Sequence, residues 1–250
     1  MRDFETLVCY GDLHFPHEDP NFLNIIIKVI KDIKPDYIVD LGDIISCDCL
    51  MDYDKKIEQL GGLQEELDAS HEWFARVNKV SNNSKKILCR DNHFYRRLYS
   101  KMRREQWMED LKAVQPDYLL KLNEFGWISE NGWCWKNTLL FVHGDDGYGG
   151  SQDAICNKVR RLVNSNSISV VRGHSHNTGM EVHKHNEDLR WAIQVGTGEC
   201  LSKIDYIKNK EFNNWTQSFG VFYLSKETKE FWFVPIICQN GRALFNGKLY

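Results

Sequence analysis

The sequence lacks the features that would place the protein in a membrane or give it a strong global charge. No apolar run approaches the roughly 18–20 residues that span a bilayer, and the N-terminal residues do not form the apolar stretch of a signal peptide. The formal net charge is only −3, so any binding of nucleic acid must be local rather than driven by a global field. We therefore expect a cytoplasmic protein without membrane association.

Paired thiols, repeats and linkers are also missing. The eight cysteines form no C-x-x-C pair, and several lie within apolar runs, where free thiols behave as small hydrophobic residues. The chain contains no internal repeat and no low-complexity linker, and its 250 residues can bury a sizeable core. We expect a single domain over 1–250, with buried free cysteines.

Residues whose side chains can bind a divalent metal follow five short hydrophobic segments, each typical of a buried strand. Buried strands that carry polar side chains at their C-terminal ends build a site at one edge of an α/β sheet. Imidazoles, carboxylates and one amide recur in these segments without a thiolate, which suits Mn, Fe, Zn, Co or Ni better than Mg or Ca alone. The segments are G-D-L-H at 11–14, G-D at 42–43, D-N-H at 91–93, V-H-G-D at 142–145 and G-H-S-H at 173–176.

This set of side chains is too large for one ion. Two metal ions about 3.5–4 Å apart can hold the attacking and the leaving oxygen of a displacement at phosphorus, and they lower the pKa of bound water to about 7. The pattern therefore predicts a binuclear site for phosphoester hydrolysis. The seven predicted ligands are Asp12, His14, Asp43, Asn92, His143, His174 and His176.

The order D-x-H, G-D, N-H, H-G and G-H-x-H resembles the calcineurin-like metallophosphoesterases. The resemblance implies an α/β fold, an α-β-β-α sandwich of two mixed β-sheets flanked by helices, with the metals at the C-terminal ends of the strands. Small stand-alone members, including many carried by bacteriophages, are similar in length and are often nucleases or nucleotide phosphodiesterases.

The resemblance also implies a role for each residue of the site. A hydroxide that bridges the metals would attack phosphorus, and His93 would be the general acid that protonates the leaving oxygen. We expect Mn to fill both sites, with Fe, Ni, Zn or Co as alternatives. One metal would be held by Asp12, His14, Asp43 and His176, and the other by Asp43, Asn92, His143 and His174.

Two blocks depart from the family pattern. Ser46 stands where an Asp usually orients the catalytic histidine, so the nearest acid, Asp48, is the candidate for that role. Asp91 replaces the usual Gly of the third block, and Asp tolerates the left-handed backbone region better than most residues. The Arg that binds phosphate in the phosphoprotein phosphatase branch is missing, which argues against a protein phosphatase.

Apolar spacing predicts helices between these strands and further strands towards the C-terminus. The segment 46–83, where members of the family differ most, is a candidate cap over the metals. The predicted helices cover 20–34, 57–80 with a break at 61–62, 93–114 and 151–163, and the later strands cover 191–195, 219–224 and 230–237.

Basic and aromatic residues alternate after His93, a pattern that favours a nucleotide or short single-stranded nucleic acid. A solvated helix face with its rings packed inward explains the same pattern. His17 is a candidate phosphate contact, with an ordinary loop histidine as its alternative. The basic residues are Arg96, Arg97, Lys101, Arg103 and Arg104, of which Arg96 and Arg97 are the predicted substrate contacts, and the aromatic ones are Phe94, Tyr95, Tyr99 and Trp107.

We therefore predict a phosphodiesterase or nuclease that acts on nucleotides or nucleic acid. The alternatives are a phosphomonoesterase, acting on a nucleotide or a protein, and a non-catalytic metal-binding scaffold. The missing phosphate-binding Arg favours the diester.

Overall fold

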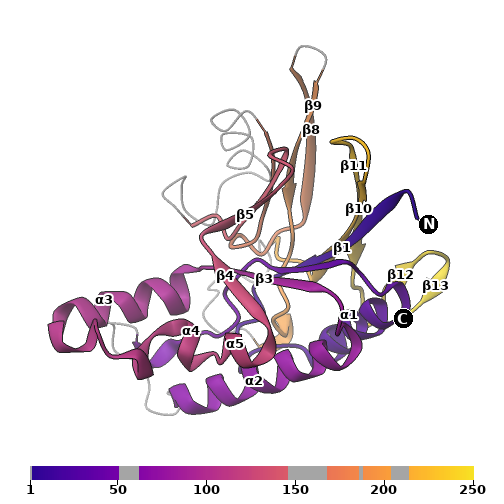
Figure 1. The fold of residues 1–250 in the computed structure, drawn as a ribbon. Helices are drawn as coiled ribbons and strands as arrows, with labels where there is room; N and C mark the ends of the chain where they lie inside the picture. Colours follow the sequence, from indigo (N-terminus) through magenta and orange to yellow (C-terminus); the bar gives the residue numbers. More distant parts are fainter. Residues whose placement is uncertain (1, 51–61, 146–167, 186–187, 204–213) are drawn as a thin grey trace.

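Two large β-sheets stack face to face, and helices cover the outer face of the first (Figure 1). The computed structural model describes residues 2–50, 62–145, 168–185, 188–203 and 214–250. Both sheets contain parallel and antiparallel pairs, so the expected sandwich of two mixed sheets is confirmed. The helix expected at 151–163 lies outside the described residues.

The strands are short, and each predicted strand is present. The first sheet runs in the order β11 (Phe231–Ile237), β10 (Ser218–Ser225), β1 (Phe4–Tyr10), β2 (Tyr37–Asp40), β3 (Lys85–Cys89) and β4 (Trp127–Glu130). The second runs in the order β5 (Gly132–Trp135), β6 (Leu139–Val142), β7 (Ser169–Arg172), β9 (Asp188–Gln194) and β8 (Gly179–His185). A separate hairpin joins β12 (Leu244–Phe245) to β13 (Lys248–Leu249).

The parallel strands deliver their loops to one edge. β1, β2, β3 and β4 are mutually parallel neighbours, as are β6, β7 and β9. β1 shows why these segments are continuous hydrophobic runs, since its two faces are both buried. Val8 and Tyr10 pack towards the helices, whereas Leu7 and Cys9 pack between the sheets.

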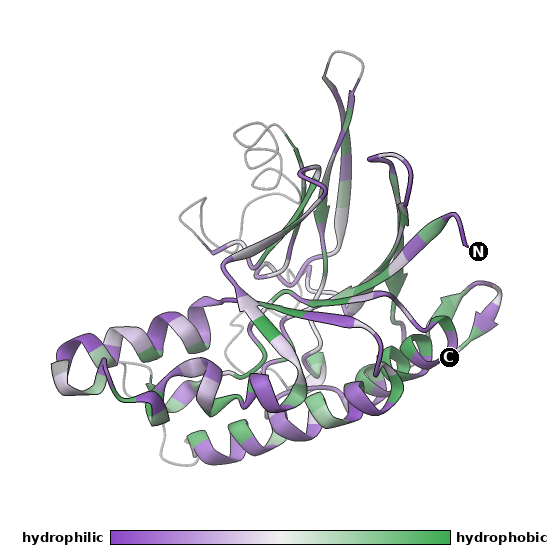
Figure 2. Cartoon of the chain, in the orientation of Figure 1, coloured by the Kyte–Doolittle hydropathy of each residue, from purple (hydrophilic) through white to green (hydrophobic). Residues whose placement is uncertain are grey.

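The described helices are α1 (Pro20–Ile33), α2 (Leu63–Val80), α3 (Arg97–Arg104), α4 (Pro116–Leu119) and α5 (Leu122–Phe125). α1 begins as predicted, with Asp19 accepting a hydrogen bond from the amide of Asn21, and ends at Lys34 in the left-handed region. Figure 2 shows hydrophobic residues along its inner side. None of the helices in the described ranges is both long and apolar enough to cross a membrane.

The helix predicted over 93–114 is shorter in the structure. A π-helical turn, Asn92–Arg96, leads into α3, and only 3₁₀ turns follow, at Gln106–Met108 and Lys112–Val114. Buried residues recur every four positions at Phe94, Leu98 and Met102, but the next position is the polar Gln106. The helix ends where its apolar face ends, because packing of that face supplies most of the stability of a short helix.

The segment 46–83 contributes a structural layer. Trp73, Phe74 and Val77 of α2 are buried in the core between the helices and the first sheet. This part of the candidate cap therefore lies within the helical layer, while 51–61 lie outside the described residues.

Candidate metal centre

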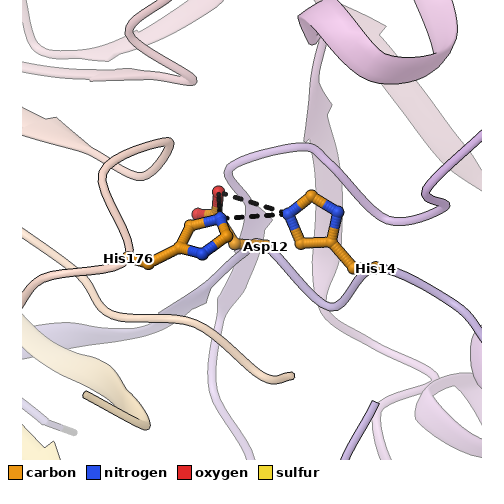
Figure 3. A group of neighbouring side chains, drawn as sticks. All are labelled: Asp12, His14 and His176. Atoms are coloured by element: carbon orange, nitrogen blue, oxygen red, sulfur yellow. Dashed lines mark hydrogen bonds and ion pairs between the residues drawn. The ribbon is translucent and has the colours of Figure 1, made fainter. Parts of the chain in front are cut away.

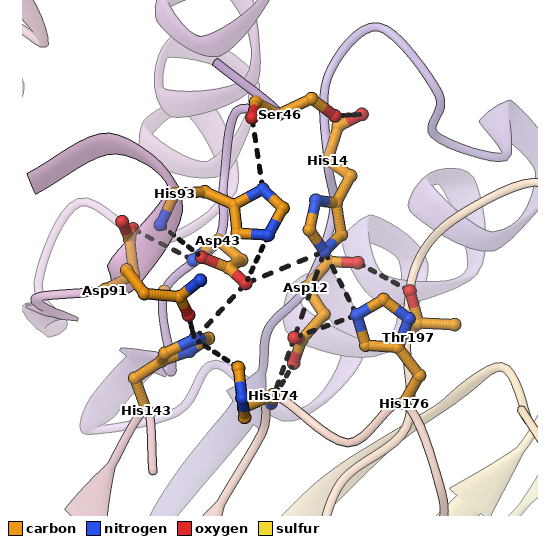
Figure 4. Close-up of polar contacts among 12 residues, drawn as sticks. Asp12, His14, Asp43, Ser46, Asp91, His93, His143, His174, His176 and Thr197 are labelled. Carbon is orange, nitrogen blue, oxygen red and sulfur yellow. Dashed lines mark hydrogen bonds and ion pairs between the residues drawn. The ribbon is translucent and has the colours of Figure 1, made fainter. Parts of the chain in front are cut away.

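Five loops converge at the C-terminal ends of β1, β2, β3, β6 and β7 (Figure 4). Each carries one or two of the predicted ligands, so both sheets contribute to one cluster. The loops after β1 and β2 are joined by backbone hydrogen bonds, from the amide of Asp12 to the carbonyl of Gly42 (2.8 Å) and from the amide of His14 to that of Asp43 (2.9 Å). All seven predicted ligands lie in these loops, at the edge where the parallel strands end.

The first group comprises Asp12, His14 and His176, all buried (Figure 3). The Nε2 atom of His176 lies 3.2 Å from Oδ1 of Asp12 and 3.1 Å from Nε2 of His14. Their nearest donor atoms all lie within 4.8 Å of one another, which is close enough for a single ion.

The second group comprises Asp43, His143 and His174, with Asn92 beside them. The Nε2 atom of His143 lies 3.2 Å from Oδ2 of Asp43, 3.2 Å from Nδ1 of His174 and 2.8 Å from Oδ1 of Asn92. The same Oδ2 atom of Asp43 lies 3.8 Å from Nε2 of His14. Asp43 therefore stands between the two groups, where one carboxylate could serve both.

The donor atoms fit divalent ions by type and by spacing. Two imidazole nitrogens that each lie about 2.0–2.1 Å from one ion are separated by about 2.8–3.4 Å at right-angled or tetrahedral geometry. The two nitrogen pairs, at 3.1 and 3.2 Å, fall within that range. Each group could hold one ion without a large rearrangement.

The backbone of the cluster is strained in a way that no propensity scale predicts. Most residues avoid the left-handed region, at a cost of roughly 1–3 kcal/mol each. Tight turns at the strand ends therefore hold these side chains against an intrinsic backbone preference. The predicted ligands with a positive φ are Asp12 (54°), His14 (52°), Asp43 (50°), His174 (64°) and His176 (58°).

Two glycines allow the loops to approach so closely. A Cβ atom at Gly173 would lie 2.3 Å from Oδ2 of Asp12, which itself accepts a hydrogen bond from the amide of His174. Gly42 has a φ of 97°, and a Cβ there would lie 2.7 Å from the carbonyl oxygen of Cys89. These positions leave no room for a side chain beside the predicted ligands.

Outer contacts orient the imidazoles. Nδ1 of His176 lies 3.1 Å from Oε2 of the buried Glu199, which leaves Nε2 directed at Asp12. Nδ1 of His143 lies 2.9 Å from the carbonyl oxygen of Leu41, which leaves its Nε2 directed at Asp43. Metal-binding histidines are commonly held in this way, by a carboxylate or carbonyl on the second nitrogen.

His93 lies beside both groups with a more exposed side chain. Its Nε2 atom is 3.7 Å from Oδ2 of Asp43, and its Nδ1 atom is 3.0 Å from the carbonyl oxygen of Ser46. The side chain is 23% exposed, compared with 1% for His143. Nδ1 of His93 therefore faces this backbone carbonyl, while a carboxylate oxygen of Asp48 lies 3.4 Å from Nε2 of His17.

Asp91 does not occupy the left-handed region that its place in the third block suggests. Its φ is −123°, and its side chain caps the following π-helical turn by accepting a hydrogen bond from the amide of Phe94 (2.8 Å). The second carboxylate oxygen accepts one from the amide of Asp43 (2.9 Å). The expectation for the backbone was wrong, because a capping carboxylate needs an extended residue.

The predicted substrate contacts divide into two kinds. Arg96 is exposed and forms an ion pair with Asp145, whereas Arg97 donates hydrogen bonds to the carbonyls of Ser46 (2.6 Å) and Cys47 (3.4 Å). Arg97 therefore binds the backbone of the loop after β2. Among the aromatic residues Phe94 and Tyr95 are buried, Tyr99 packs against the core, and Trp107 is 68% exposed.

No family model matches this sequence. Two curated bacteriophage proteins are similar to it over 98% of both chains: the gene 54 protein of Mycobacterium phage L5, with 23% identity, and that of phage D29, with 22%. Their names state no activity.

Several solved structures are also similar. Vacuolar protein sorting 29 from Cryptosporidium parvum has a TM-score of 0.48 and 14% identity, with 100% of this chain and 96% of that chain covered. A Mycoplasma pneumoniae phosphatase has a TM-score of 0.47 and 9% identity, with 95% of each chain covered. The E. coli phosphoesterase YfcE has a TM-score of 0.40 and 13% identity, with 92% and 98% covered.

The chain resembles the calcineurin-like metallophosphoesterases. The resemblance read from the motifs extends to the two mixed sheets and to the loops that bring the motif residues together. Two carboxylates near the site, Glu199 and Glu66, are not among the predicted residues. Glu199 follows β9 within the segment G-T-G-E, so the rule that found the other residues, a polar group just after a strand, also applies to it. Glu66 has no such signal, because it lies within α2.

Without metals, protons occupy part of the cluster. Burial acts to lower the pKa of His143, but Asp43 raises it to about 10. Burial acts on His176 in the same direction, and Asp12 and Glu199 raise its pKa to about 10. Burial and the neighbouring His143 lower the pKa of His174 to about 4. At neutral pH each group therefore holds one imidazolium.

We expect metal uptake at pH 7 to release about one proton for each ion from these imidazolium groups. Both pKa values are raised, so the extra protons are present below pH about 10, and apparent affinity should rise up to tenfold per pH unit between pH 6 and 8. Titration calorimetry in buffers of different ionisation enthalpy measures the protons released. Glu199→Gln should reduce the release at the first group, and uptake without proton release in any buffer would contradict the assignment.

Proposed function

We propose that this protein is a two-metal phosphohydrolase of the calcineurin-like type and that its substrate is a phosphodiester. One observation carries the proposal: two groups of potential ligand residues meet at Asp43, whose Oδ2 atom lies 3.2 Å from Nε2 of His143 and 3.8 Å from Nε2 of His14, and His93 stands beside them with one ring nitrogen directed at the cluster. A non-catalytic scaffold would have no need for a histidine whose Nδ1 contacts a carbonyl while its Nε2 faces the cluster, so the arrangement favours an enzyme.

Each of the two groups of side chains would provide the ligands of one metal ion. When bound, the two divalent ions would supply a hydroxide nucleophile at neutral pH and stabilise charge on the phosphoryl oxygens. As an imidazolium, His93 would hold the proton for the leaving oxygen on Nε2, because Nδ1 is engaged with the carbonyl of Ser46. One ion would be held by Asp12, His14, Asp43 and His176, and the other by Asp43, Asn92, His143 and His174.

The charges around His93 support a diester rather than a monoester. A monoester dianion needs positive charge beyond that of the two ions, and the guanidinium that shares the Ser46 carbonyl with His93, that of Arg97, already donates to two carbonyls. Two acids, Asp48 and Glu66, lie on or against the same loop. A diester carries only one negative charge and is therefore repelled less by these two carboxyl groups than a monoester dianion is. His17, paired with Asp48 at 3.4 Å, is the proposed phosphate contact on this side.

α3 supports a nucleic acid as the extended substrate. Figure 2 shows it as a mainly hydrophilic helix, and Figure 1 shows it at the end of the helical layer. Arg103 and Arg104 are exposed on it, Arg96 is exposed at the end of the preceding π-helical turn, and the exposed ring of Trp107 follows. Exposed guanidinium groups can contact flanking phosphates, and an exposed indole can stack on a base, which is how single strands are bound without sequence preference.

We expect hydrolysis of bis(4-nitrophenyl) phosphate and of single-stranded oligonucleotides to exceed that of 4-nitrophenyl phosphate and nucleoside monophosphates. The assay uses Mn, Ni and Zn in turn, and EDTA should abolish activity reversibly. Rates on oligonucleotides should fall with added salt because released counterions are part of the binding free energy. Faster hydrolysis of monoesters than of every diester would instead support the phosphomonoesterase, with a nucleotide or phosphoprotein as substrate.

Charge reversal tests the nucleic-acid surface separately. Arg103→Glu combined with Arg104→Glu should lower activity on oligonucleotides and reduce its dependence on salt, while sparing the small nitrophenyl diester. Lys28→Glu combined with Lys31→Glu is the matched control, since it makes the same change in charge at two exposed positions of α1. Equal losses from both pairs would assign the effect to overall charge and not to α3.

A further inference from the structure

The carbonyl oxygen of Ser46 accepts hydrogen bonds from two side chains, those of His93 and Arg97. Nδ1 of His93 lies 3.0 Å from this oxygen, and a guanidinium nitrogen of Arg97 donates to it at 2.6 Å. A carbonyl oxygen has two lone pairs and can accept both. Because the imidazole and the guanidinium come from the same chain segment, four residues apart, the oxygen ties the π-helical turn that carries His93 to the loop after β2.

Glu66 also binds this loop. This carboxylate, on the first turn of α2, is 1% exposed, and its Oε2 atom accepts a hydrogen bond from the amide of Cys47 at 2.5 Å. Cys47 has a φ of 51°, so the backbone here is held in an unfavourable conformation. Burial of a carboxylate is costly, and the hydrogen bond from the amide of Cys47 offsets part of that cost. The same bond fixes the direction of the peptide next to the Ser46 carbonyl.

Resting on the proposed function, we propose that Arg97 and Glu66 are positioning residues for His93. Together they fix the Ser46 carbonyl, which then selects the tautomer of His93 that carries its proton on Nδ1 and directs Nε2 at the cluster. In this chain a backbone carbonyl braced by an Arg and a Glu takes the place of an orienting carboxylate. This assignment also explains why Ser can occupy position 46, because the group used there is part of the main chain.

A spectroscopic experiment tests the positioning without any turnover. In metal-free protein labelled with ¹⁵N-histidine, long-range ¹H–¹⁵N correlations report which ring nitrogen is protonated, and His93→Gln assigns the signal. At a pH where His93 is neutral, the wild type should show the Nδ1-protonated form. Arg97→Met and Glu66→Ala should shift the population towards the Nε2-protonated form or a mixture. Glu66→Gln should resemble the wild type, since its amide oxygen can still accept from Cys47.

A kinetic experiment tests the consequence. Arg97→Met and Glu66→Ala should slow hydrolysis of phenyl diesters by about 10-fold or more, up to the loss caused by His93→Ala, and affect dinitrophenyl diesters far less. In the His93→Ala background Arg97→Met should add no more than about a twofold effect. Arg76→Met is the matched control, because that guanidinium binds Asn24 at the α1–α2 contact (2.7 Å) and should show no dependence on leaving group.

The two proposals fail in different ways. If the wild type hydrolyses no phosphoester, the proposed function is lost, while the tautomer of His93 still decides the positioning. If the wild type is active but Arg97→Met leaves the tautomer unchanged and slows all leaving groups equally, the positioning inference is overturned. Unchanged metal content and melting temperature in the variants establish that each remains folded.

Discussion

Replacing His93 with Ala is expected to lower turnover of a phenyl or alkyl phosphodiester by about 10²–10⁴-fold while both metals remain bound, since general acid catalysis contributes about that much. The side chain lies 3.7 Å from the carboxylate of Asp43 and is the most exposed of the histidines in its group with Asp43 and His14. It can therefore reach a leaving oxygen without being needed to hold an ion.

The size of this loss should depend on the leaving group. Nitrophenolate and dinitrophenolate leave without protonation, so their diesters should lose much less than a phenyl diester. His183→Ala, which removes a histidine paired with Glu181 on β8, is the control and should change neither rate. The donor atoms of His14, Asp43 and His93 lie close enough together to hold an ion, so His93 could itself be a metal ligand. Elemental analysis of each variant therefore measures whether the metals are retained. Loss of an ion, or equal losses on all leaving groups, would mean that His93 binds metal or orients the substrate.

Asp43→Asn is expected to weaken both metal sites together, each by more than about 10²-fold. Loss of an outer partner typically costs about 10–100-fold in metal affinity, and Asp43 is a proposed direct ligand of both ions. Its Oδ2 atom lies 3.2 Å from Nε2 of His143 and 3.8 Å from Nε2 of His14, so the two groups meet at this carboxylate. Metal content after dialysis against limiting Mn measures the loss, and activity should fall with it.

Asp40→Asn is the matched control for this substitution. Asp40 is equally buried, and burial raises the pKa of its carboxyl well above the usual value. Its Oδ1 atom accepts a hydrogen bond from the amide of Gly42 (3.0 Å), which an Asn oxygen can also accept. Loss of only one ion in Asp43→Asn would contradict the shared ligand. Equal metal loss in Asp40→Asn would assign the effect to folding of the loop.

The strands and the predicted ligands could be found in the sequence because each leaves a local signal. A strand buried on both faces, such as β1, appears as a continuous hydrophobic run. The Asp and His residues follow such runs directly, and the edge of a parallel sheet brings them together. α1 was also predictable, since Asp19 and Pro20 mark its start and Pro35 follows its end.

Other features of the site left no local signal. The partner of His93 is a carbonyl of the main chain, which every residue possesses, so the sequence pointed instead to the nearest acid, Asp48. The hydrogen bond from Arg97 to the carbonyl of Ser46 depends on where the loop after β2 passes. Glu66 reaches that loop from α2, nineteen residues along the chain. Each of these contacts joins segments whose separation in sequence carries no information about their distance in space.

By itself, the sequence determined the donor chemistry of this protein, the order of its ligand-bearing segments and their attachment to strands, because residue type and hydrophobic period are written locally. Only the tertiary structure decided how each donor is aimed. It placed Asp43 between two groups and held five of the predicted ligands in the left-handed region. It also placed Nδ1 of His93 beside the backbone carbonyl of Ser46. The physical reason is that orientation depends on strain and on hydrogen bonds between distant segments, which packing of the two sheets supports and no single segment encodes.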